Sequence, residues 1–555
     1  MSTADVDRAV NEVRRAQQAF AEFSQEQVDK VISAMHEACM TRLDQWARMA
    51  HEETGYGIVA DKVAKNRFGA DDVYRYIRPM KTVGFISADP AQGVYEVASP
   101  MGVVAAVIPS TNPTSTAIYK VLISLKARNG IVLSPHPSAK NCIKAVADAM
   151  HDAAVAAGAP RGIIACLPSP SIADTQALMR HRGTNVILAT GGMGLVNAAY
   201  SSGKPAYGVG PGNVPAFIER TAALRKAVKD VLAGKCFDWG TICASEQSLI
   251  VDAPLADRAK DEFLRWGGYF VNEREKALLE VLMVDKNGAL NPKVVGRSPQ
   301  VIAQMAGFSV PESVRALLVP EEGVGRDYPL SIEKLSPVLS YYVADGWEAG
   351  CLRCIEVLKY GGLGHTLCLH TQDLEVIRQF ALKKPVFRIL INTPGTHGAI
   401  GYSTNLPPSM TLGCGALGNN ITSDNITPLH LMDRKRVCYE ARPVTDEKAV
   451  PLKPLVSLES ASEDAAARFV SLKFGASPSL PQRTATGAPP SAPRPGANSP
   501  AAPANAPGVE TLDFVSEAEV RAALRAGHKL RVNAKTLMTP SARELGEQER
   551  IFERV

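Results

Sequence analysis

The sequence lacks several features that define whole classes of protein. In its 555 residues, no uncharged apolar run approaches the roughly 18 residues that a membrane-spanning helix needs. The first residues, Met1 to Asp5, lack the basic and apolar regions of a secretory signal. The net charge is only +5 and is not concentrated in one block, which gives little support to nucleic-acid binding. We therefore expect a cytoplasmic protein that binds neither membranes nor nucleic acid.

The ten cysteines also lack the rhythm of a disulfide framework. We expect free thiols in a reducing compartment. Cys351 and Cys354 have a spacing found in zinc sites, but no second Cys/His pair stands in ligand spacing and the stretch has a helical pattern. We interpret this pair as structural and predict no metal site.

The chain contains a long alternation of helix and strand patterns. Residues 5–50 are helical, with Val28, Val31, Ile32 and Met35 on one face. From residue 94 onward, short apolar strands alternate with helices, which predicts parallel βαβ units and an α/β fold. The expected strands are Val103–Ile108, Ile131–Ser134, Ile163–Leu167 and Val186–Thr190, and the helices between them are Thr114–Lys126, Ala139–Ala157 and Ile172–Arg180. A second α/β pattern spans about 240–410.

Loops rich in Gly, Pro and small polar residues follow three of these strands, at 109–113, 134–137 and 190–194. Open parallel sheets bind ligands at the carboxyl ends of their strands. Glycines allow a close backbone approach, and a following helix N-terminus favours an anionic group. The segment Gly191–Gly194 does not match GxGxxG and, read alone, is a turn. A second glycine loop is Gly208–Asn213.

The segment Lys235–Gln247 carries the candidate nucleophile, Cys243. Cys243 follows a turn-prone Gly240 and precedes a hydrophobic strand, Ser248–Val251. A cysteine reacts as its thiolate and has a free pKa of about 8.5, so a tight turn with nearby backbone N–H groups suits it. Small buried thiols are also common core residues. Cys243 alone therefore does not establish catalysis.

Further polar clusters follow at 333–337, 361–366 and 392–397. The second cluster contains His365, which follows a glycine pair in an otherwise apolar region. A lone histidine in such a place is often a structural residue. Whether His365 is structural or functional depends on the residues around it.

After Val437 the composition changes. Residues 476–508 are dominated by Ala, Pro, Ser and Gly, which predicts a disordered linker. Ser516 to Glu519 then forms a capping box inside a Val515/Val520 staple.

This pattern predicts a short helix over about Glu517–Ala526 that ends at Gly527. Because so short a helix is marginal alone, we expect it to dock on another surface. A possible strand at Leu530–Val532 follows, and a second short helix opens at Thr539–Arg543.

Taken together, the motifs of residues 1–440 are specific. They are Asn112–Ile118, Ser134–Pro137, Ala189–Gly192, Ala199–Pro205, Ile242–Gln247, Glu333–Pro337, Gly364–Thr366 and Thr411–Gly415, with Phe237-x-x-Gly240-x-x-Cys243 at the nucleophile. In these motifs the chain resembles the CoA-acylating aldehyde dehydrogenases, in particular the aldehyde dehydrogenase half of the bifunctional aldehyde-alcohol dehydrogenases.

The resemblance implies an aldehyde dehydrogenase-like fold with a Rossmann-like nucleotide-binding domain, an α/β catalytic domain and a small strand element that joins the subunits of a homo-oligomer. The implied divisions are the nucleotide-binding domain (1–239, with a contribution from 411–440), the catalytic domain (240–410), a family-like segment (441–475), the linker (476–508) and a targeting or docking tail (509–555).

The resemblance also implies residue roles. Cys243 would be the nucleophile, and the Asn112 amide would hold the substrate oxygen together with the Cys243 N–H. His365 would assist the CoA step, and Glu333 would reach the nicotinamide-side ribose. The residues implied to bind NAD are Pro109, Ser110, Thr111, Asn112, Ser134, His136, Gly191, Gly192, Gly210, Glu333 and Leu412.

The implied reaction converts a short-chain aldehyde, NAD and coenzyme A reversibly to acyl-CoA and NADH through a Cys243 thioester. In hydrolytic aldehyde dehydrogenases, a Glu-Leu-Gly-Gly motif supplies the base that activates water. The matching stretch here, Gly208–Asn213, has no carboxylate, and loss of a general base costs about 10²–10⁴-fold. CoA is therefore the expected acceptor, with hydrolysis to a carboxylic acid as the alternative.

The cofactor phosphate is less constrained by the sequence. Hydrolytic relatives often place a Glu after the second strand to bind the ribose 2′-hydroxyl. Here Ser134–Pro137 supplies no Glu, and no Arg sits close by to receive a 2′-phosphate. We expect NAD on the strength of the resemblance.

The linker and tail resemble the encapsulation extensions of bacterial microcompartment enzymes. We therefore expect residues 510–555 to bind a shell protein or another cargo enzyme in a microcompartment lumen. The alternative is a dispensable tail or a small element that docks on the enzyme itself. A non-catalytic scaffold or filament protein of the same fold is a further alternative, and it predicts a decayed active site.

Overall fold

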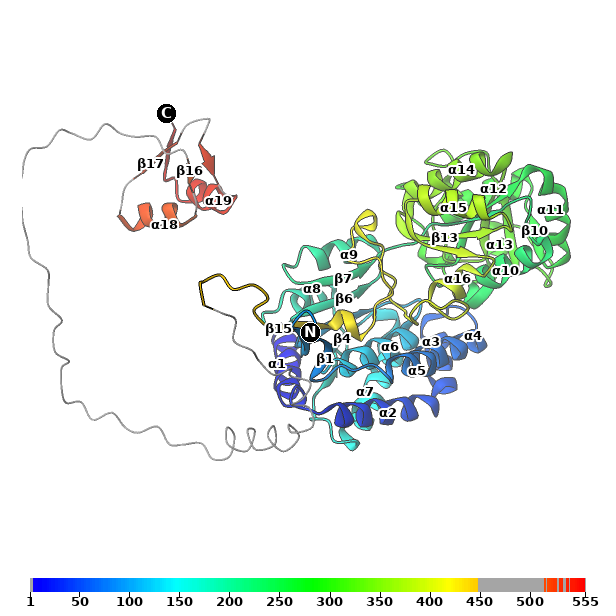
Figure 1. Ribbon diagram of the computed structural model, residues 1–555. Helices are drawn as coiled ribbons and strands as arrows, with labels where there is room; N and C mark the ends of the chain where they lie inside the picture. Colours follow the sequence, from blue (N-terminus) through cyan, green and yellow to red (C-terminus); the bar gives the residue numbers. More distant parts are fainter. Residues whose placement is uncertain are drawn as a thin grey trace, which may run out of the picture. The chain divides into compact units, whose positions relative to one another are not determined.

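The computed structural model describes residues 3–447 and, nearer the C-terminus, residues 514–515, 517–526, 529–532, 536–538 and 540–554. The chain divides into two compact units, Met1–Ala465 and Ala466–Val555 (Figure 1). The expected linker, 476–508, lies outside the described residues, as do Ser516 and Gly527 at the ends of the expected tail helix. In the described part of the chain, every helix is too short or too polar to cross a bilayer.

The first unit begins with helices. These are α1 (Thr3–Phe20), α2 (Gln25–Met40), α3 (Leu43–Thr54), α4 (Val59–Arg67), a π-helical turn η1 (Phe68–Asp72) and α5 (Val73–Ile77). Ser24 caps α2 in a capping box with Gln27. The expected apolar face of α2 is confirmed, since Val28, Val31, Ile32 and Met35 are all buried.

A five-stranded parallel sheet follows, in the order β5-β4-β3-β6-β7. Its strands are β3 (Val103–Ile108), β4 (Gly130–Pro135), β5 (Ile164–Cys166), β6 (Val186–Thr190) and β7 (Ala206–Val209). The helices between them are α6 (Pro113–Lys126), α7 (Lys140–Ala156), α8 (Ile172–Arg180) and α9 (Met193–Tyr200). The expected strands and helices are confirmed to within a residue or two at their ends.

Both faces of this sheet are covered, and alternate residues of β3 show how. Val104, Ala106 and Ile108 belong to a core shared with α2, α3, α6 and α7. Val103 and Ala105 face a second core shared with α1, α8 and α9. Side chains alternate between faces along a strand, so a strand buried on both sides is apolar throughout, as parallel sheets require.

The strand order reverses beside β3, because β4 lies on one side of it and β6 on the other. In open parallel sheets, ligands bind at such a switch point, outside the carboxyl ends of the strands. The loops at 109–113 and 190–194 lie at this place.

A seven-stranded parallel sheet forms the second half of the unit, in the order β10-β11-β12-β9-β8-β13-β14. Its strands are β8 (Val214–Ile218), β9 (Glu246–Asp252), β10 (Gly268–Phe270), β11 (Ala316–Pro320), β12 (Val338–Ala344), β13 (Gly364–His370) and β14 (Val386–Ile391). Its helices are α10 (Leu224–Cys236), α11 (Ala256–Arg265), α12 (Glu273–Met283), α13 (Pro299–Ala306), α14 (Gly346–Gly361), α15 (Leu374–Lys383) and α16 (Gly395–Ala399).

The second sheet begins before residues 239/240, where the sequence analysis placed the boundary between the two domains. The strand β8 pairs with β9 and β13, and α10 packs on the same core. The two sheets therefore divide between Val209 and Val214. The sequence expectation missed β8, which is a short apolar segment directly after a glycine loop.

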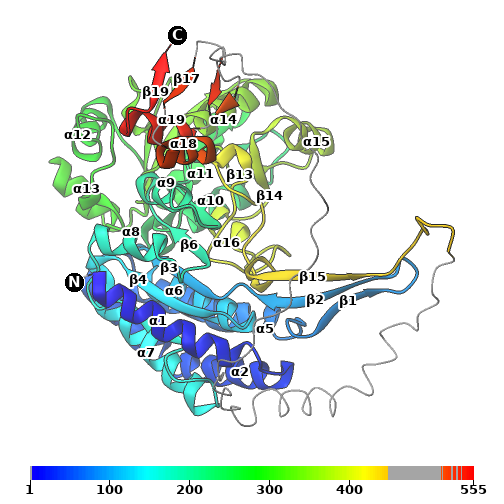
Figure 2. The same cartoon turned by 90° about the vertical axis from the view of Figure 1, so that its left-hand side faces the viewer.

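A three-stranded antiparallel sheet joins distant parts of the chain. It pairs β1 (Phe85–Asp89) with β2 (Val94–Pro100), and β2 with β15 (Met432–Cys438). Figure 2 shows this sheet extending away from the rest of the first unit. Just before β15, Ile426 and Leu431 enter the core of the first sheet, so part of the 411–440 segment packs with that sheet.

The second unit is a duplicated β-α-β arrangement. Its elements are β16 (Phe514–Val515), α18 (Glu517–Ala526), β17 (Leu530–Val532), β18 (Leu537–Met538), α19 (Pro540–Gln548) and β19 (Phe552–Arg554). β16 pairs in parallel with β18, and β17 with β19. The expected helices and the strand at 530–532 are confirmed. The apolar face of α18 is covered within the unit, by a core of Val515, Val520, Ala523, Leu530, Val532, Ala542 and Ile551.

Candidate active site

Cys243 lies in the turn between η3 (Phe237–Gly240) and β9, as expected from the sequence. Gly240 has a φ of +72°, and a Cβ there would come within 3.1 Å of the Lys235 carbonyl oxygen. Asp238 and Trp239 also have positive φ values, 48° and 51°. Such backbone is strained for residues with side chains and persists only where the surroundings hold it.

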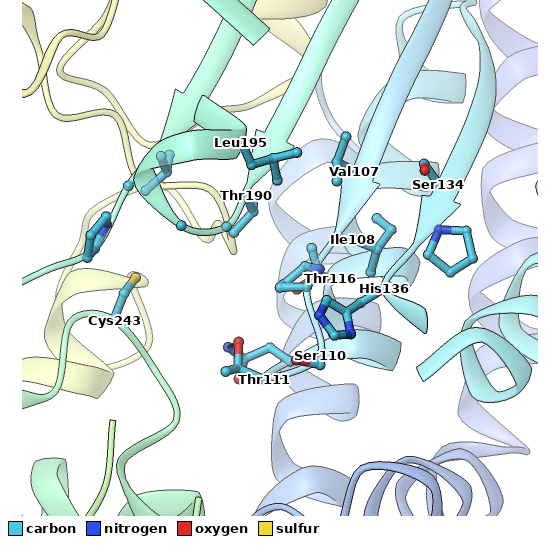
Figure 3. Close-up of a pocket in the computed structure, with 18 of the residues that line it drawn as sticks. Val107, Ile108, Ser110, Thr111, Thr116, Ser134, His136, Thr190, Leu195 and Cys243 are labelled. Carbon is cyan, nitrogen blue, oxygen red and sulfur yellow. Dashed lines mark hydrogen bonds between the residues drawn. The ribbon is translucent and has the colours of Figure 1, made fainter. Parts of the chain in front are cut away.

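One cavity of about 760 Å³ runs from Cys243 to the carboxyl ends of β3, β4 and β6 (Figure 3). This volume lies within the range of small-molecule and cofactor sites. The cavity brings together Cys243 and all the residues expected to bind NAD, which are Pro109, Ser110, Thr111, Asn112, Ser134, His136, Gly191, Gly192, Gly210, Glu333 and Leu412.

His365 is placed differently. It is fully buried at the start of β13 and does not line the cavity. A Cβ on Gly212 would come within 3.1 Å of its ring and 2.3 Å of the Cys243 carbonyl oxygen, so Gly212 lies against both. Burial, with a smaller effect of Arg388, lowers the pKa of His365 to about 3. The imidazole is therefore neutral, and its part in the CoA step stays a prediction.

The thiol of Cys243 is not ionised in this setting. Burial raises its pKa to about 12, and the nearby Glu333 and Cys414 act in the same direction. A proton must leave the sulfur for it to act as a nucleophile, because the thiolate is the reactive form.

Glu333 is the one carboxylate among the described residues that line the cavity. Its Oε1 accepts a hydrogen bond of 2.8 Å from the Gly212 N–H. Burial raises its pKa to about 7. Glu333 is thus an acceptor whose charge changes near neutral pH, attached to the glycine loop that faces Cys243.

The Asn112 amide is held from both ends. Its Oδ1 accepts a hydrogen bond of 2.7 Å from the Lys65 ammonium. Its Nδ2 donates to the Thr241 carbonyl at 3.2 Å and to the Thr111 hydroxyl at 3.2 Å. Asn112 therefore connects the end of β3 with the turn that carries Cys243.

The far end of the cavity offers small groups and open backbone. A Cβ on Gly192, which caps the N-terminus of α9, would meet no other atom within 4 Å. The buried Thr190 hydroxyl has no partner among the described groups. Free donors and a helix N-terminus suit the phosphates and sugars of a dinucleotide, so the residues present fit this cofactor.

Known proteins share this architecture. A family model described as the aldehyde dehydrogenase family matches residues 1–265. The chain is 45% identical over 446 residues to the bifunctional aldehyde-alcohol dehydrogenase AdhE of Escherichia coli, which covers 79% of this chain and 50% of that protein. The chain thus spans about half the length of this relative. It is also 35% identical over 434 residues to the acetylating succinate-semialdehyde dehydrogenase of Clostridium kluyveri, which covers 78% of this chain and 95% of that enzyme.

The chain belongs to the acylating aldehyde dehydrogenase family.

Solved structures agree with this assignment. The acetylating aldehyde dehydrogenase of Geobacillus thermoglucosidasius has 49% identity and a TM-score of 0.79, covering 80% of this chain and 98% of that one. A propionaldehyde dehydrogenase from a Clostridium phytofermentans bacterial microcompartment has 26% identity and a TM-score of 0.71, covering 78% and 97%. The Rhodopseudomonas palustris propionaldehyde dehydrogenase with bound propionyl-CoA has 27% identity and a TM-score of 0.71, covering 78% and 94%.

The sequence interpretation missed a buried charge cluster beside the nucleophile turn. Lys62 and Lys65 of α4 both contact the Asp238 carboxylate, and all three side chains are at most 3% exposed. Two lysines in a short helix resemble a solvated face, so no local signal indicates their burial. The strained Asp238 backbone is equally invisible in the sequence.

Cys351 and Cys354, whose spacing is found in zinc sites, lie in α14 and pack in the core against the second sheet. Across the described residues, no group of His, Cys, Asp and Glu side chains is arranged to hold a metal ion.

Proposed function

We propose that the protein is a CoA-acylating aldehyde dehydrogenase, which converts a short-chain aldehyde, NAD and coenzyme A reversibly to acyl-CoA and NADH. The observation that carries this proposal is the single cavity. It connects the Cys243 thiol to the switch point of the first sheet, where Gly192 and Thr190 leave space and donors for a dinucleotide. Similarity to a propionaldehyde dehydrogenase that was solved with propionyl-CoA supports the acceptor.

In this proposal the Cys243 thiol loses its proton to solvent and its sulfur attacks the aldehyde carbon; Cys243 regains a proton when the CoA thiol gives one up in the final acyl transfer. The Asn112 amide and the Cys243 N–H hold the oxygen of the resulting thiohemiacetal, and one such donor typically contributes about 2.7–4 kcal/mol to transition-state stabilisation. Bound NAD supplies the acceptor for the hydride that the adduct releases. Cys243 then carries the acyl group as a thioester until the CoA thiol displaces it.

The residues proposed to hold NAD divide along the cavity. Ser134 and His136 lie at the end of β4, where the Ser134 hydroxyl pairs with Thr175 at 2.8 Å. Gly191 and Gly192 lie at the start of α9, and Glu333 lies nearest the nucleophile loop. The described lining contains no Lys or Arg to pair with a 2′-phosphate, which favours NAD over NADP.

One observation favours the hydrolytic alternative. Gly208–Asn213 has no carboxylate, but Glu333 is bonded to Gly212 in that loop and has a pKa of about 7. A base with a pKa near the working pH is suited to activate water. Under this alternative, Glu333 would act on water rather than on the ribose.

A single assay separates the alternatives. Purified protein is given propanal and NAD, with and without CoA, and NADH and the product are measured. We expect NADH to form with CoA present, together with propionyl-CoA. Equal rates without CoA and release of propanoate would establish the hydrolytic enzyme, and no NADH under either condition would favour the scaffold. A series of aldehydes then identifies the substrate.

We also propose that residues 510–555 direct the enzyme to a bacterial microcompartment by binding a shell protein or another cargo enzyme. Support comes from the second unit, which has a core of its own, and from similarity to an enzyme of such a compartment. Deleting residues 476–555 is the test. Unchanged activity with lost co-sedimentation supports targeting, whereas lost activity assigns the tail to the catalytic body.

The three-stranded sheet supports a further proposal, that the enzyme is a homo-oligomer. Its outer strands β1 and β15 each pair with β2, and among the described residues no strand pairs with the other edge of either, which leaves these edges to pair with another chain. A light-scattering mass equal to one chain would contradict this proposal.

A further inference from the structure

Lys65 is a buried cation that the proposed reaction does not use, and it touches a residue that the reaction does use. Its ammonium group meets three acceptors, the Asn112 Oδ1 at 2.7 Å, the Thr241 Oγ1 at 3.3 Å and the Asp238 carboxylate. An ammonium has three N–H donors and no acceptor. All three donors are therefore engaged around one point beside the cavity.

This arrangement fixes which way the Asn112 amide faces. An amide has one end that accepts and one that donates, and the two ends have nearly the same shape. Turning the group over would place its NH₂ against the Lys65 ammonium and its oxygen against the Thr241 carbonyl, to which Nδ2 now donates. Both contacts would be repulsive, so only one orientation is compatible with the cluster.

The remaining groups hold Lys65 in place. Asp238 accepts from Lys65 and, at 3.1 Å, from Lys62, and it also accepts from the Thr241 hydroxyl at 2.8 Å. The Ile58 N–H donates to the other oxygen of Asp238 at 2.7 Å. Gly57 leaves room for this carboxylate, since a Cβ there would lie 1.9 Å from it.

The electrostatics of the pair agree with this geometry. Burial lowers the pKa of Lys65 to about 8, and Asp238 acts against that shift. The pKa of Asp238 is below its ordinary value although burial opposes this, because both lysines favour the charged carboxylate. A charged Lys65 is thus retained out of contact with bulk water.

We propose that Lys65 is a positioning residue for acyl transfer: anchored by Asp238, it holds the Asn112 amide with Nδ2 on the side of the Cys243 turn, where an N–H that now bonds Thr111 or Thr241 can exchange that acceptor for the reacting oxygen. This inference rests on the proposed function, because Asn112 is the hydrogen-bond donor that the proposed reaction needs. It also gives the N-terminal helix α4 a part in the chemistry of the Cys243 turn.

The test compares Lys65→Met with Lys62→Met. Both substitutions remove one ammonium from the same buried carboxylate, from the same helix and at nearly equal burial, but only Lys65 contacts Asn112. We expect Lys65→Met to lower kcat by about 10²-fold, the order seen when an oxyanion donor is lost, with little change in KM for NAD. Lys62→Met should stay within about tenfold of the wild-type kcat.

A double-mutant cycle separates positioning from general damage. In an Asn112→Ala background, adding Lys65→Met should change kcat by no more than about twofold, because the group it positions is already gone. If Lys65→Met lowers kcat equally in both backgrounds, or if Lys62→Met matches it, the proposal is overturned.

Two controls keep the result interpretable. If Lys65→Met unfolds, Lys65→Leu replaces it, since either substitution leaves the buried Lys62–Asp238 pair in place. Crystal structures of either variant and of Lys62→Met should show the Asn112 amide reoriented only where Lys65 is absent. An unmoved amide overturns the inference. If the wild-type protein forms no NADH from propanal with CoA, the proposed function itself is overturned. If the wild-type protein is active and Lys65→Met has the same rate, only the inference about Lys65 is overturned.

Discussion

The two ends of the active-site cavity are built by different means. At the end formed by the first sheet, the described lining combines apolar side chains and prolines with small polar residues and open glycines such as Gly192, and it contains no Lys, Arg, Asp or Glu. At the end formed by the second sheet, Cys243 lies beside Glu333 and close to the buried Lys65–Asp238 pair. Binding at the first end depends on shape and backbone groups, whereas chemistry at the second depends on fixed charges.

This difference predicts that cofactor binding and catalysis can be impaired separately. Substitutions at the nucleophile end should act on kcat, and substitutions at the glycine end should act on cofactor affinity. The tests below are ordered from the largest expected effect to the smallest.

Cys243→Ser should have the largest effect. Glu333 is the one carboxylate in the described lining, and the lining histidine, His136, lies at the other end of the cavity beside β4. Loss of a nucleophile typically costs about 10⁴-fold or more. CoA-dependent NADH formation from propanal measures this loss, and quenching of protein fluorescence measures NAD binding, which should persist. A variant that still makes thioester at close to the native rate would remove Cys243 from the mechanism.

Asn112→Ala should lower kcat by about 10²–10³-fold, because it removes one oxyanion donor. The change in KM for NAD should be less than about threefold, although Asn112 lines the same cavity. Steady-state kinetics with varied NAD at saturating CoA give both constants. Equal losses in kcat and in NAD affinity would show that the two ends are not separable at this residue.

Alkylation of Cys243 in the free enzyme should accelerate steeply with pH. Because burial raises the pKa of Cys243 to about 12, the thiolate fraction rises about tenfold per pH unit, or about 10²-fold from about pH 7 to about pH 9. Iodoacetamide labelling followed by peptide mass spectrometry reports the rate at this residue. A rate that levels off near neutral pH would mean that the thiol is already activated.

Gly192→Val should have the smallest effect, confined to the cofactor. Its φ of −66° is open to any residue, and a Cβ there meets nothing within 4 Å. The side chain would occupy cavity space and weaken NAD binding about tenfold, which corresponds to about 1.4 kcal/mol, with kcat and melting temperature nearly unchanged. An unaltered KM for NAD would place the cofactor elsewhere.

The contrast between the two ends also explains what the sequence could predict. Strands such as β3 and β6 are continuous apolar runs, and the loops after them contain Gly and Pro, so their places and their convergence follow from periodicity and from parallel topology. The expected cofactor residues in the loops at 109–113, 134–137 and 190–194 converge for this reason, whereas Gly210, Glu333 and Leu412 were expected from the family resemblance.

Other features depend on contacts between distant segments. Lys65 and Asp238 are 173 residues apart, and nothing local distinguishes a buried lysine from a solvated one. His365 fits its motif but lies behind Gly212, because its side chain enters the core at the start of β13. The boundary between the two sheets lies earlier in the chain than expected. A short strand such as β8 can be assigned to a sheet only from the strands that it pairs with.

The duplicated second unit has a consequence for how a tail of this kind can be shortened. Each half supplies one strand to each of the two parallel pairs, β16 with β18 and β17 with β19. A truncation after Val532 would leave both remaining strands without their partners and would remove Ala542 and Ile551 from the core that contains Val515 and Val520. We therefore expect the second unit to fold only as a whole, so that transplanting it to another protein requires both halves.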